Sequence, residues 1–161
     1  MVNGLLSIDN YVLFDKMVTL KDRNQAIKFT NGNDISINTF IKFCRKFLNE
    51  NPGKVLVCYE SQFTKLSREN CHAKAIIISK QMDIYNMIVF DPSNGKEALV
   101  NSNERAIGKS LNIELIKLVY GNQTHQTDCI ARSLRYIYNI FTNNNIITNY
   151  KTFNIIKNKF I

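Results

Sequence analysis

The sequence predicts an α+β domain in which a small mixed or antiparallel sheet packs against helices. An apolar stripe at helical spacing comes first, within residues 34–53. Several β-branched runs follow between residues 54 and 121, and a second helical stripe begins near residue 129. The order helix, strands, helix is typical of α+β proteins. With 161 residues, of which 45% are hydrophobic, and only 2 prolines, we expect a single domain that spans residues 1–161.

The first helix is predicted within DISINTFIKFCRKFLNENPG, residues 34–53. Asp34 or Ser36 can cap its start, and Asn51-Pro52-Gly53 ends it. Because Cys44 lies on the apolar stripe, we expect this thiol in the core. The stripe repeats at steps of three and four residues and consists of Ile37, Phe40, Ile41, Cys44, Phe47 and Leu48.

Four segments read as strands, because they are rich in β-branched residues and bounded by polar turns. The short connection KQMDIY, residues 80–85, predicts that the second and third strands form an antiparallel hairpin. The first thirty residues, with NYVLFDKMVTL, fit either a strand or a helix, and the Asn-rich TNNNIITN near the end reads as a turn. The four strands are KVLVCYES (54–61), AKAIIIS (73–79), NMIVFD (86–91) and IELIKLVYG (113–121).

A second helix is predicted after the polar run GNQTHQTDC, with an apolar stripe of Ile130, Leu134, Ile137 and Phe141. Thr127 or Asp128 suits the N-cap, which places Cys129 in the first turn. A helix N-terminus favours the thiolate form of a cysteine, and the N–H of that residue can face a developing oxyanion. The alternative is that Cys129 is a small buried residue at the start of a core helix.

A cysteine nucleophile needs a base, and the base needs an orienting group. His72 precedes the strand at 73–79, and Asp91 ends the next strand. In a hairpin those two positions meet at one edge, so Asp91 could bond the imidazole and fix its tautomer. The alternatives are that His72 is an ordinary strand-end residue and that Asp91 belongs to a plain turn, DPSNG.

Two rival arrangements use other residues. His125 lies four residues before Cys129 in a polar loop, without a carboxylate on a rigid element beside it. Zinc could take Cys71, His72, His125 and Cys129, but those spacings match no common zinc pattern. The four cysteines also form no C-x-x-C pair, so we expect neither a metal nor another cofactor.

The order histidine, acidic residue, glutamine, cysteine resembles the cysteine proteases typified by the adenovirus maturation protease and the SUMO-deconjugating proteases. In that family nearly twenty residues separate the histidine from the acidic residue, and His72 and Asp91 are 19 apart. A glutamine stands six residues before the nucleophile, as Gln123 does in QTHQTDC, with Asp128 directly before Cys129. The resemblance covers residues 71–141.

The resemblance implies a papain-like architecture with the nucleophile at a helix N-terminus. It implies that Cys129 attacks a peptide carbonyl, that His72 acts as general base and then acid, and that Asp91 orients His72. Gln123 and the N–H of Cys129 would form the oxyanion hole, while Gln126 would be a spectator.

The function expected from this resemblance is a cysteine endopeptidase that processes viral capsid or core proteins during virion maturation. Asn, Ile and Lys, which A/T-rich codons encode, supply 22, 21 and 15 residues, and this fits large DNA viruses and virophages. The sequence shows neither a signal-peptide pattern nor an apolar run of about 20 residues. We therefore expect a place in the host cytoplasm or nucleus, or inside the virion, and no secretion or membrane partner.

Three alternatives remain for the function. The first is a ubiquitin- or SUMO-like deconjugating protease of an intracellular pathogen, and the second is a YopJ-like acetyltransferase, which uses a similar triad. The third is a basic binding module in which Cys129 is an inert core thiol.

The net charge of +8 fits a solvated surface or contact with a polyanion. Arg132 and Arg135 lie off the apolar stripe of the second helix, and further lysines gather near the C-terminus. No aromatic base-reading motif accompanies them, so we expect non-specific DNA binding through phosphates. The candidate contacts are Arg132, Arg135, Lys151, Lys157 and Lys159.

Overall fold

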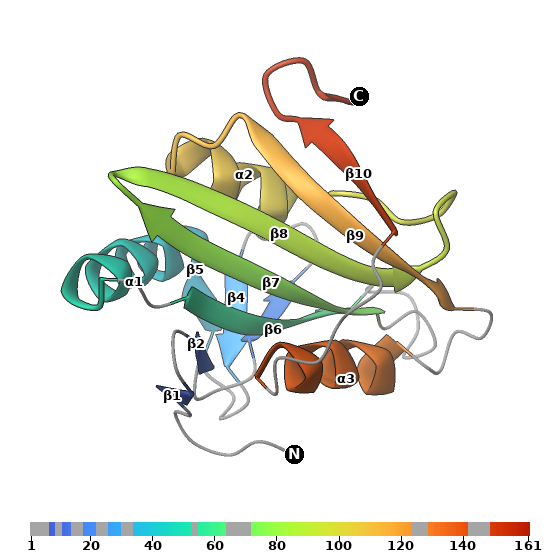
Figure 1. The fold of residues 1–161 in the computed structure, drawn as a ribbon, viewed down its shortest axis with the longest axis horizontal. Helices are drawn as coiled ribbons and strands as arrows, with labels where there is room; N and C mark the ends of the chain where they lie inside the picture. The colour runs from blue at the N-terminus through green and yellow to red at the C-terminus, as the bar shows by residue number, and fades with distance from the viewer. Residues whose placement is uncertain are drawn as a thin grey trace.

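The protein is α+β, with a mixed sheet between two layers of helices (Figure 1). The computed structural model describes residues 7–8, 11–13, 18–21, 26–29, 34–52, 55–63, 72–123, 129–141 and 149–161. Helices α1 (Ile37–Glu50) and α2 (Ser102–Ser110) pack on one face of the sheet, and α3 (Cys129–Phe141) packs on the other. The predicted α+β class, with a mixed sheet packed against helices, is confirmed.

The centre of the sheet consists of four long strands, and all four were predicted from the sequence. They are β6 (Val55–Phe63), β7 (His72–Gln81), β8 (Ile84–Ser93) and β9 (Leu115–Gln123). β7 is antiparallel to both of its neighbours, β6 and β8, so the predicted hairpin at the second and third of these strands is confirmed. β9 lies parallel to β8.

Shorter strands extend the sheet on both sides. Beyond β9 come β10 (Asn149–Asn154) and β11 (Lys159–Phe160), each antiparallel to its inner neighbour. Beyond β6 come β3 (Val18–Lys21), β4 (Ala26–Phe29) and β5 (Asp34–Ser36), while β2 (Tyr11–Leu13) also pairs with β6 and carries β1 (Ser7–Ile8). The described part of the N-terminal region, which fitted either a strand or a helix, is therefore strand.

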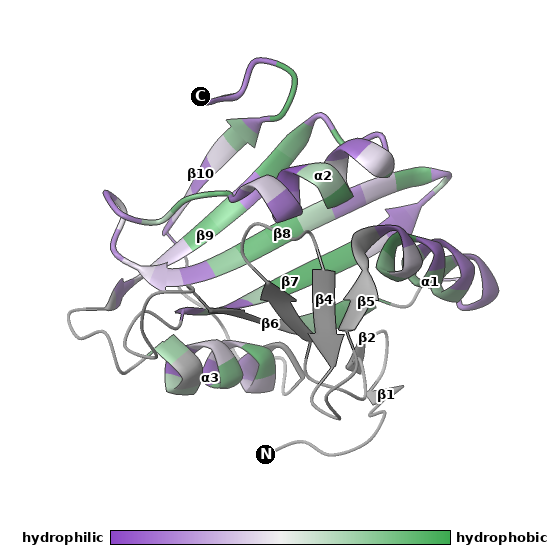
Figure 2. Ribbon diagram, turned by 180° about the vertical axis from the view of Figure 1, so that it is seen from behind, coloured by the Kyte–Doolittle hydropathy of each residue, from purple (hydrophilic) through white to green (hydrophobic). Residues whose placement is uncertain are grey.

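The larger core lies between the sheet and the pair α1 and α2. Phe40, Ile41, Cys44 and Leu48 of α1 are buried there, as the helical stripe predicts. In Figure 2 these two helices lie in front of β7, β8 and β9, which carry apolar runs. Burial raises the pKa of Cys44 to about 12, against a smaller opposing effect of a backbone hydrogen bond, so this thiol is an unreactive core group.

Helix α2 has no counterpart in the elements predicted from the sequence. Parallel strands need a crossover connection, and α2 supplies it between β8 and β9. Asn101 caps its start by accepting from the N–H of Glu104, whose side chain accepts in turn from the N–H of Asn101. Gly108 in the helix lets it lie close to β9, because a Cβ there would stand 3.2 Å from Ile116 Cδ1.

A smaller core lies under α3 on the opposite face. It contains Cys129, Tyr136 and Ile137 of the helix together with alternate residues of the central strands. The Tyr136 ring stacks on Phe90 of β8 at a centroid distance of 4.2 Å. Leu134 and Ile137 of the predicted stripe pack here, and the side chains of Ile130 and Phe141 lie outside the described part. Within the described residues, no helix has the length and apolar character needed to cross a membrane.

We expect Gly121→Ala to destabilise the protein, because a Cβ at Gly121 would stand 2.7 Å from the carbonyl oxygen of Pro92. Both atoms belong to the backbone or are fixed to it, so β8 and β9 would have to move apart where they end. Overpacking of this kind costs about 1–3 kcal/mol. Urea unfolding measures the loss, with the exposed neighbour Asn122→Ala as control. Equal midpoints for the two variants would contradict the close approach of the strands.

Candidate functional site

Three strand ends meet at one edge of the sheet and carry predicted site residues. β7 runs antiparallel to β8, and β8 runs parallel to β9, so the start of β7 lies beside the ends of β8 and β9 (Figure 1). His72 begins β7, Asp91 lies near the end of β8, and Gln123 ends β9 as the register partner of Ser93. The topology therefore gathers residues that are up to 51 positions apart in the sequence.

His72 and Asp91 form a hydrogen-bonded pair. Nε2 of His72 lies 2.7 Å from Oδ1 of Asp91, and 3.4 Å from the hydroxyl of Ser93. The His72 side chain is 26% exposed and the Asp91 side chain 2%. Within the described residues no hydrogen bond involves Nδ1 of His72, so a proton held on Nε2 by Asp91 leaves Nδ1 as the acceptor.

The Asp91 carboxylate is buried and satisfied at both oxygens. Oδ1 accepts from His72 and from the N–H of Ser93 at 3.0 Å, and Oδ2 accepts from the N–H of Leu99 at 3.2 Å. Burial by itself raises the pKa of Asp91, but the hydrogen bond from His72, the charges of Lys74 and His72 and the Ser93 N–H outweigh it. The pKa of Asp91 therefore lies well below its ordinary value, and the group is a carboxylate.

Behind this pair lies a buried ion network. Lys74, two residues along β7, is 1% exposed; its Nζ lies 3.6 Å from Asp91 Oδ2 and 3.0 Å from Glu104 Oε1. Nζ also donates to the carbonyl of Leu99 at 2.8 Å. Glu104 of α2 is fully buried. Removing one member of such a buried pair typically costs about 3–5 kcal/mol, because it leaves the other charge uncompensated.

Cys129 is the first residue of α3, as predicted, and its side chain is 2% exposed. It packs in the core under α3 with Ala73 and Phe90, the chain neighbours of His72 and Asp91. One turn further along the helix, the hydroxyl of Ser133 donates to the carbonyl of Ala73 at 3.0 Å. This hydrogen bond ties the first turns of α3 to the start of β7.

Cys129 and the His72–Asp91 pair approach the sheet from opposite faces. Ala73, Ala75 and Ile77 of β7 point toward α3, whereas Ile76 and Ile78 point toward α1 and α2. His72 and Lys74 have the parity of Ile76, so they share the face of α2. A reaction that uses Cys129 and His72 together is therefore restricted to the end of the strand, where the sheet no longer separates the two faces.

Several predicted residues fall outside the described part. The backbone of Gln123 is placed at the end of β9, but its side chain is not described. Cys71, His125, Gln126, Thr127 and Asp128 all lie outside the described residues. Within the described part, no group of three His, Cys, Asp or Glu side chains could hold a metal ion, and Cys44, Cys58 and Cys129 form no disulfide.

Sequence reasoning missed the residues that support the pair. Lys74 lies in the predicted strand AKAIIIS, and no role was predicted for it. A lysine within an apolar strand, two residues after His72, nevertheless indicates a buried charge. The capping pattern of Asn101 and Glu104 could have revealed α2. Ser93 and Ser133 offered no pattern of their own, because their contacts depend on the tertiary fold.

The predicted DNA-contacting residues form two groups rather than one patch. On α3, Arg135 is exposed and Arg132 is half-buried. Lys157 and Lys159 are exposed near the C-terminus, at or next to β11, the outermost strand of the sheet beyond β10. Lys151 is engaged internally, with Nζ donating to the carbonyl of Gly95 at 2.7 Å and lying 4.3 Å from the centroid of the Phe160 ring.

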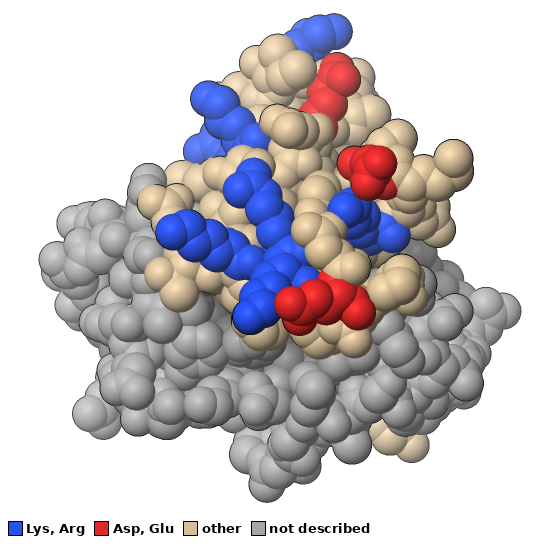
Figure 3. All heavy atoms as spheres, turned by 90° about the vertical axis from the view of Figure 1, so that its left-hand side faces the viewer, with Lys and Arg blue, Asp and Glu red and all other residues tan. Residues whose placement is uncertain are grey.

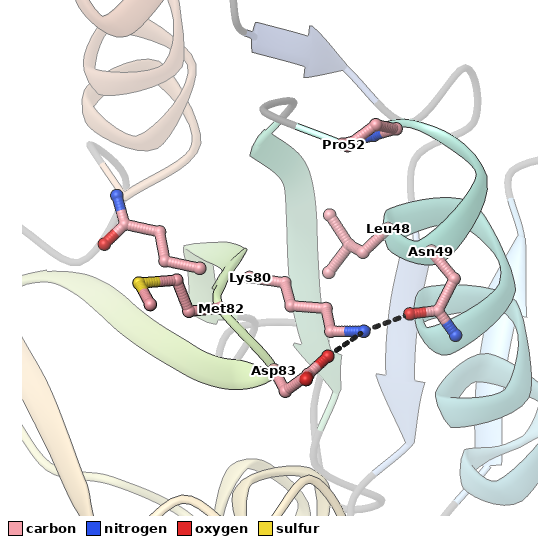
Figure 4. A pocket seen from close by; sticks show the side chains of 7 residues that line it. Leu48, Asn49, Pro52, Lys80, Met82 and Asp83 are labelled. Atoms are coloured by element: carbon pink, nitrogen blue, oxygen red, sulfur yellow. Dashed lines mark hydrogen bonds and ion pairs between the residues drawn. The ribbon is translucent and has the colours of Figure 1, made fainter.

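Two pockets on the described surface lie away from these strand ends. One, of about 540 Å³, adjoins the turn between β7 and β8, where Lys80 bridges Asn49 and Asp83 (Figure 4). It is roughly 25 Å from His72 along the strand. The other, of about 320 Å³, includes Ile88, Lys117 and Tyr150 on β8, β9 and β10. His72, Asp91 and Cys129 line neither pocket.

The depressed pKa of Asp91 predicts a loss of stability in acid. The folded state favours ionised Asp91, so its contribution is complete above the unfolded value of about 3.9 and disappears as pH falls through the folded-state pKa. Asp91→Asn should lose on the order of 1 kcal/mol or more at pH 7, and should lose less on further acidification than the wild type. Urea unfolding from pH 7 to 3 measures both, with Asp83→Asn, whose side chain is 97% exposed, as control. An identical pH dependence in wild type and Asp91→Asn would refute this role of Asp91.

No protein-family model, curated protein or solved structure matches this chain. The function of the site is therefore inferred from its geometry and from the order of its residues.

Proposed function

We propose that the protein is a cysteine endopeptidase with an adenovirus-protease-like, papain-like architecture. The observation that carries this proposal is the 2.7 Å contact between His72 and Asp91 at the sheet edge where α3 begins with Cys129. A base with its orienting carboxylate and a thiol at a helix N-terminus are the groups that thiol-dependent acyl transfer needs. Their order and spacing in the chain support the same reading.

In the proposed reaction, His72 accepts the thiol proton of Cys129 at Nδ1, and the sulfur attacks the carbonyl carbon of the scissile peptide bond. The oxyanion accepts hydrogen bonds from the N–H of Cys129 and from the side chain of Gln123. His72 then gives its proton to the leaving amine as the C–N bond breaks. Water hydrolyses the resulting thioester with His72 again as base. Asp91 stays ionised throughout and holds Nε2.

One departure from the family has a structural explanation. The family often has tryptophan after the histidine, where this chain has Ala73. Ala73 is fully buried in the core under α3, and its carbonyl accepts the Ser133 hydroxyl. A large side chain there would push α3 away from β7. The small residue thus fits a closely packed nucleophile helix.

The proposed substrate is a capsid or core protein cut during virion maturation, as the resemblance and the A/T-rich composition suggest. A ubiquitin- or SUMO-like deconjugase would differ by cleaving a probe that ends in a ubiquitin-like C-terminus. A YopJ-like acetyltransferase would consume acetyl-CoA. A binding module with Cys129 as a core thiol would do neither, and its Cys129 would react with alkylating agents no faster than Cys44.

We expect Cys129→Ala and His72→Ala each to abolish cleavage of a protein substrate while the fold is retained. Because the two residues act as a unit, the double variant should be little worse than either single variant. Gln123→Ala should lower kcat by about 10²–10³, the usual effect of removing an oxyanion donor. Kinetic assays of the purified variants, with circular dichroism to establish folding, make the measurement.

His125→Ala and Gln126→Ala are the matched controls, since the proposal gives them no role, and both should keep most of the activity. Iodoacetamide labelling followed by peptide mapping adds a test that needs no substrate: Cys129 should react faster than the core thiol Cys44. Substantial turnover by Cys129→Ala, or an inactive His125→Ala beside an active His72→Ala, would refute the assignment.

We also propose that DNA is a non-specific partner. The side of the molecule with α1 and the β7–β8 turn carries a gathering of Lys and Arg side chains (Figure 3). On α1, Lys42, Arg45 and Lys46 are all exposed, and Glu50 at its end is the only carboxylate of the helix. Three cations on one helical face suit a polyanion better than the separated groups on α3 and at the C-terminus do.

The affinity for duplex DNA should be weak, independent of sequence and steeply dependent on salt. Each engaged phosphate contributes a slope of about one log unit of affinity per log unit of salt. Replacing Lys42, Arg45 and Lys46 by Gln should lower the slope more than replacing Arg132 and Arg135 by Gln. Fluorescence anisotropy of labelled DNA at about 50 and 200 mM salt measures both variants. Absence of binding at the lower salt, or binding without salt dependence, would leave the charge as a solvated surface.

A further inference from the structure

We propose that Lys74 is a positioning residue of the site, which fixes the Asp91 carboxylate toward His72 and is itself anchored by Glu104 of α2. Its importance for catalysis rests on the proposed function. The positioning itself is a property of the fold and can be measured without a substrate.

The geometry of Asp91 carries the first step. Oδ1 accepts hydrogen bonds from His72 and from the N–H of Ser93. Oδ2 accepts from the N–H of Leu99 and lies 3.6 Å from Lys74 Nζ. A carboxylate with different partners on its two oxygens has one favourable orientation. Because the two oxygens are equivalent, a half-turn restores the same contacts, but any smaller rotation lengthens the hydrogen bonds on both oxygens.

The anchoring of Lys74 carries the second step. Nζ donates to the carbonyl of Leu99 at 2.8 Å and to Glu104 Oε1 at 3.0 Å. The same Oε1 accepts from the N–H of Asn101 at 2.8 Å, as part of the cap that starts α2. The N–H of Leu99 therefore donates to Asp91, and its carbonyl accepts from Lys74. Glu104 connects the start of α2 to the same lysine.

The charges carry the third step. Among the described residues, the titratable groups around Asp91 are His72 and Lys74 from β7 and Glu104 from α2; α3 packs on the other face of the sheet. Glu104 Oε2 is buried and lacks a hydrogen-bond partner within the described residues. The network thus holds two carboxylates and one ammonium away from water, and Lys74 is the group that separates the two negative charges. Without it, Asp91 would lose a nearby cation in a medium that screens poorly.

The double variant Lys74→Met/Glu104→Gln tests the proposal. Lys74→Met alone leaves two buried carboxylates without their cation and can fail to fold for that reason. The double variant removes one charge of each sign, so the net charge of the network is unchanged. Lys80→Met/Asp83→Asn is the matched control, because this pair lies on the same hairpin at 3.5 Å, with Asp83 97% exposed.

The first readout is the titration of the Asp91 carboxyl carbon by ¹³C NMR. In Lys74→Met/Glu104→Gln the pKa of Asp91 should rise toward its ordinary value, because the charge of Lys74, 3.6 Å from Oδ2, lowers it in the wild type. In the control variant the titration should not move. An unchanged Asp91 titration in the double variant overturns the positioning role.

The second readout is kcat/KM for the protein substrate. Loss of a fixed Asp91 should lower it about 10²-fold, the scale of a small misplacement of a catalytic group, while the control variant keeps wild-type values. A wild-type protein without proteolytic activity, combined with a shifted Asp91 titration, rejects the proposed function and supports the role of Lys74. A shifted titration with unchanged kcat/KM rejects the role of Lys74 in catalysis.

Discussion

The buried carboxylate of Asp91 has hydrogen-bond partners on both of its oxygens, and the surrounding structure depends on this requirement. Water is excluded from it, so its hydrogen bonds come from β7, from the end of β8 and from the segment that leads into α2. An ionised group without such partners would cost several kcal/mol in the interior. The position of three segments that are remote in the sequence is therefore coupled to a single side chain. The lysine beside it extends this coupling to the first turn of α2.

The parallel pairing of β8 and β9 explains why these groups collect at one edge. Had the two strands formed a hairpin, their ends would lie at opposite sides of the sheet. The crossover through α2 returns the chain to the side where β8 began, so that β9 ends beside Ser93 and α3 follows from there. The same crossover brings Glu104 over the sheet next to Lys74. The α2 connection thus brings the ends of β8 and β9 together and also places Glu104 against Lys74.

Much of this arrangement could be predicted from local patterns. The periodicity of α1, the β-branched runs of the four central strands and the position of Cys129 at the start of α3 depend on neighbouring residues alone. The contact between His72 and Asp91 followed from hairpin geometry, since a short turn fixes the register of its strands. α2 was missed because it is short, polar and contains Gly108, and its core residues are few. Lys74 was missed because it pairs with Glu104, which lies thirty residues further along the chain. Local sequence patterns do not reveal contacts between residues that far apart.

The division of the sheet into two faces sets a firm condition on the proposed chemistry. A strand sends successive side chains to opposite faces, and Cys129 packs with the residues that point toward α3, while His72 has the opposite parity. Within the sheet two such side chains could never cooperate. His72, however, is the first residue of β7, and α3 begins at that edge, tied there by the Ser133 hydroxyl on the Ala73 carbonyl. For the proposed reaction the base has to stand at a strand start: His72 pairs with Gln62 of β6, but the pairing of β7 with β8 begins only at Ala75. That requirement gives a physical reason for the place of this histidine in the sequence, directly before an apolar strand and nineteen residues before its carboxylate.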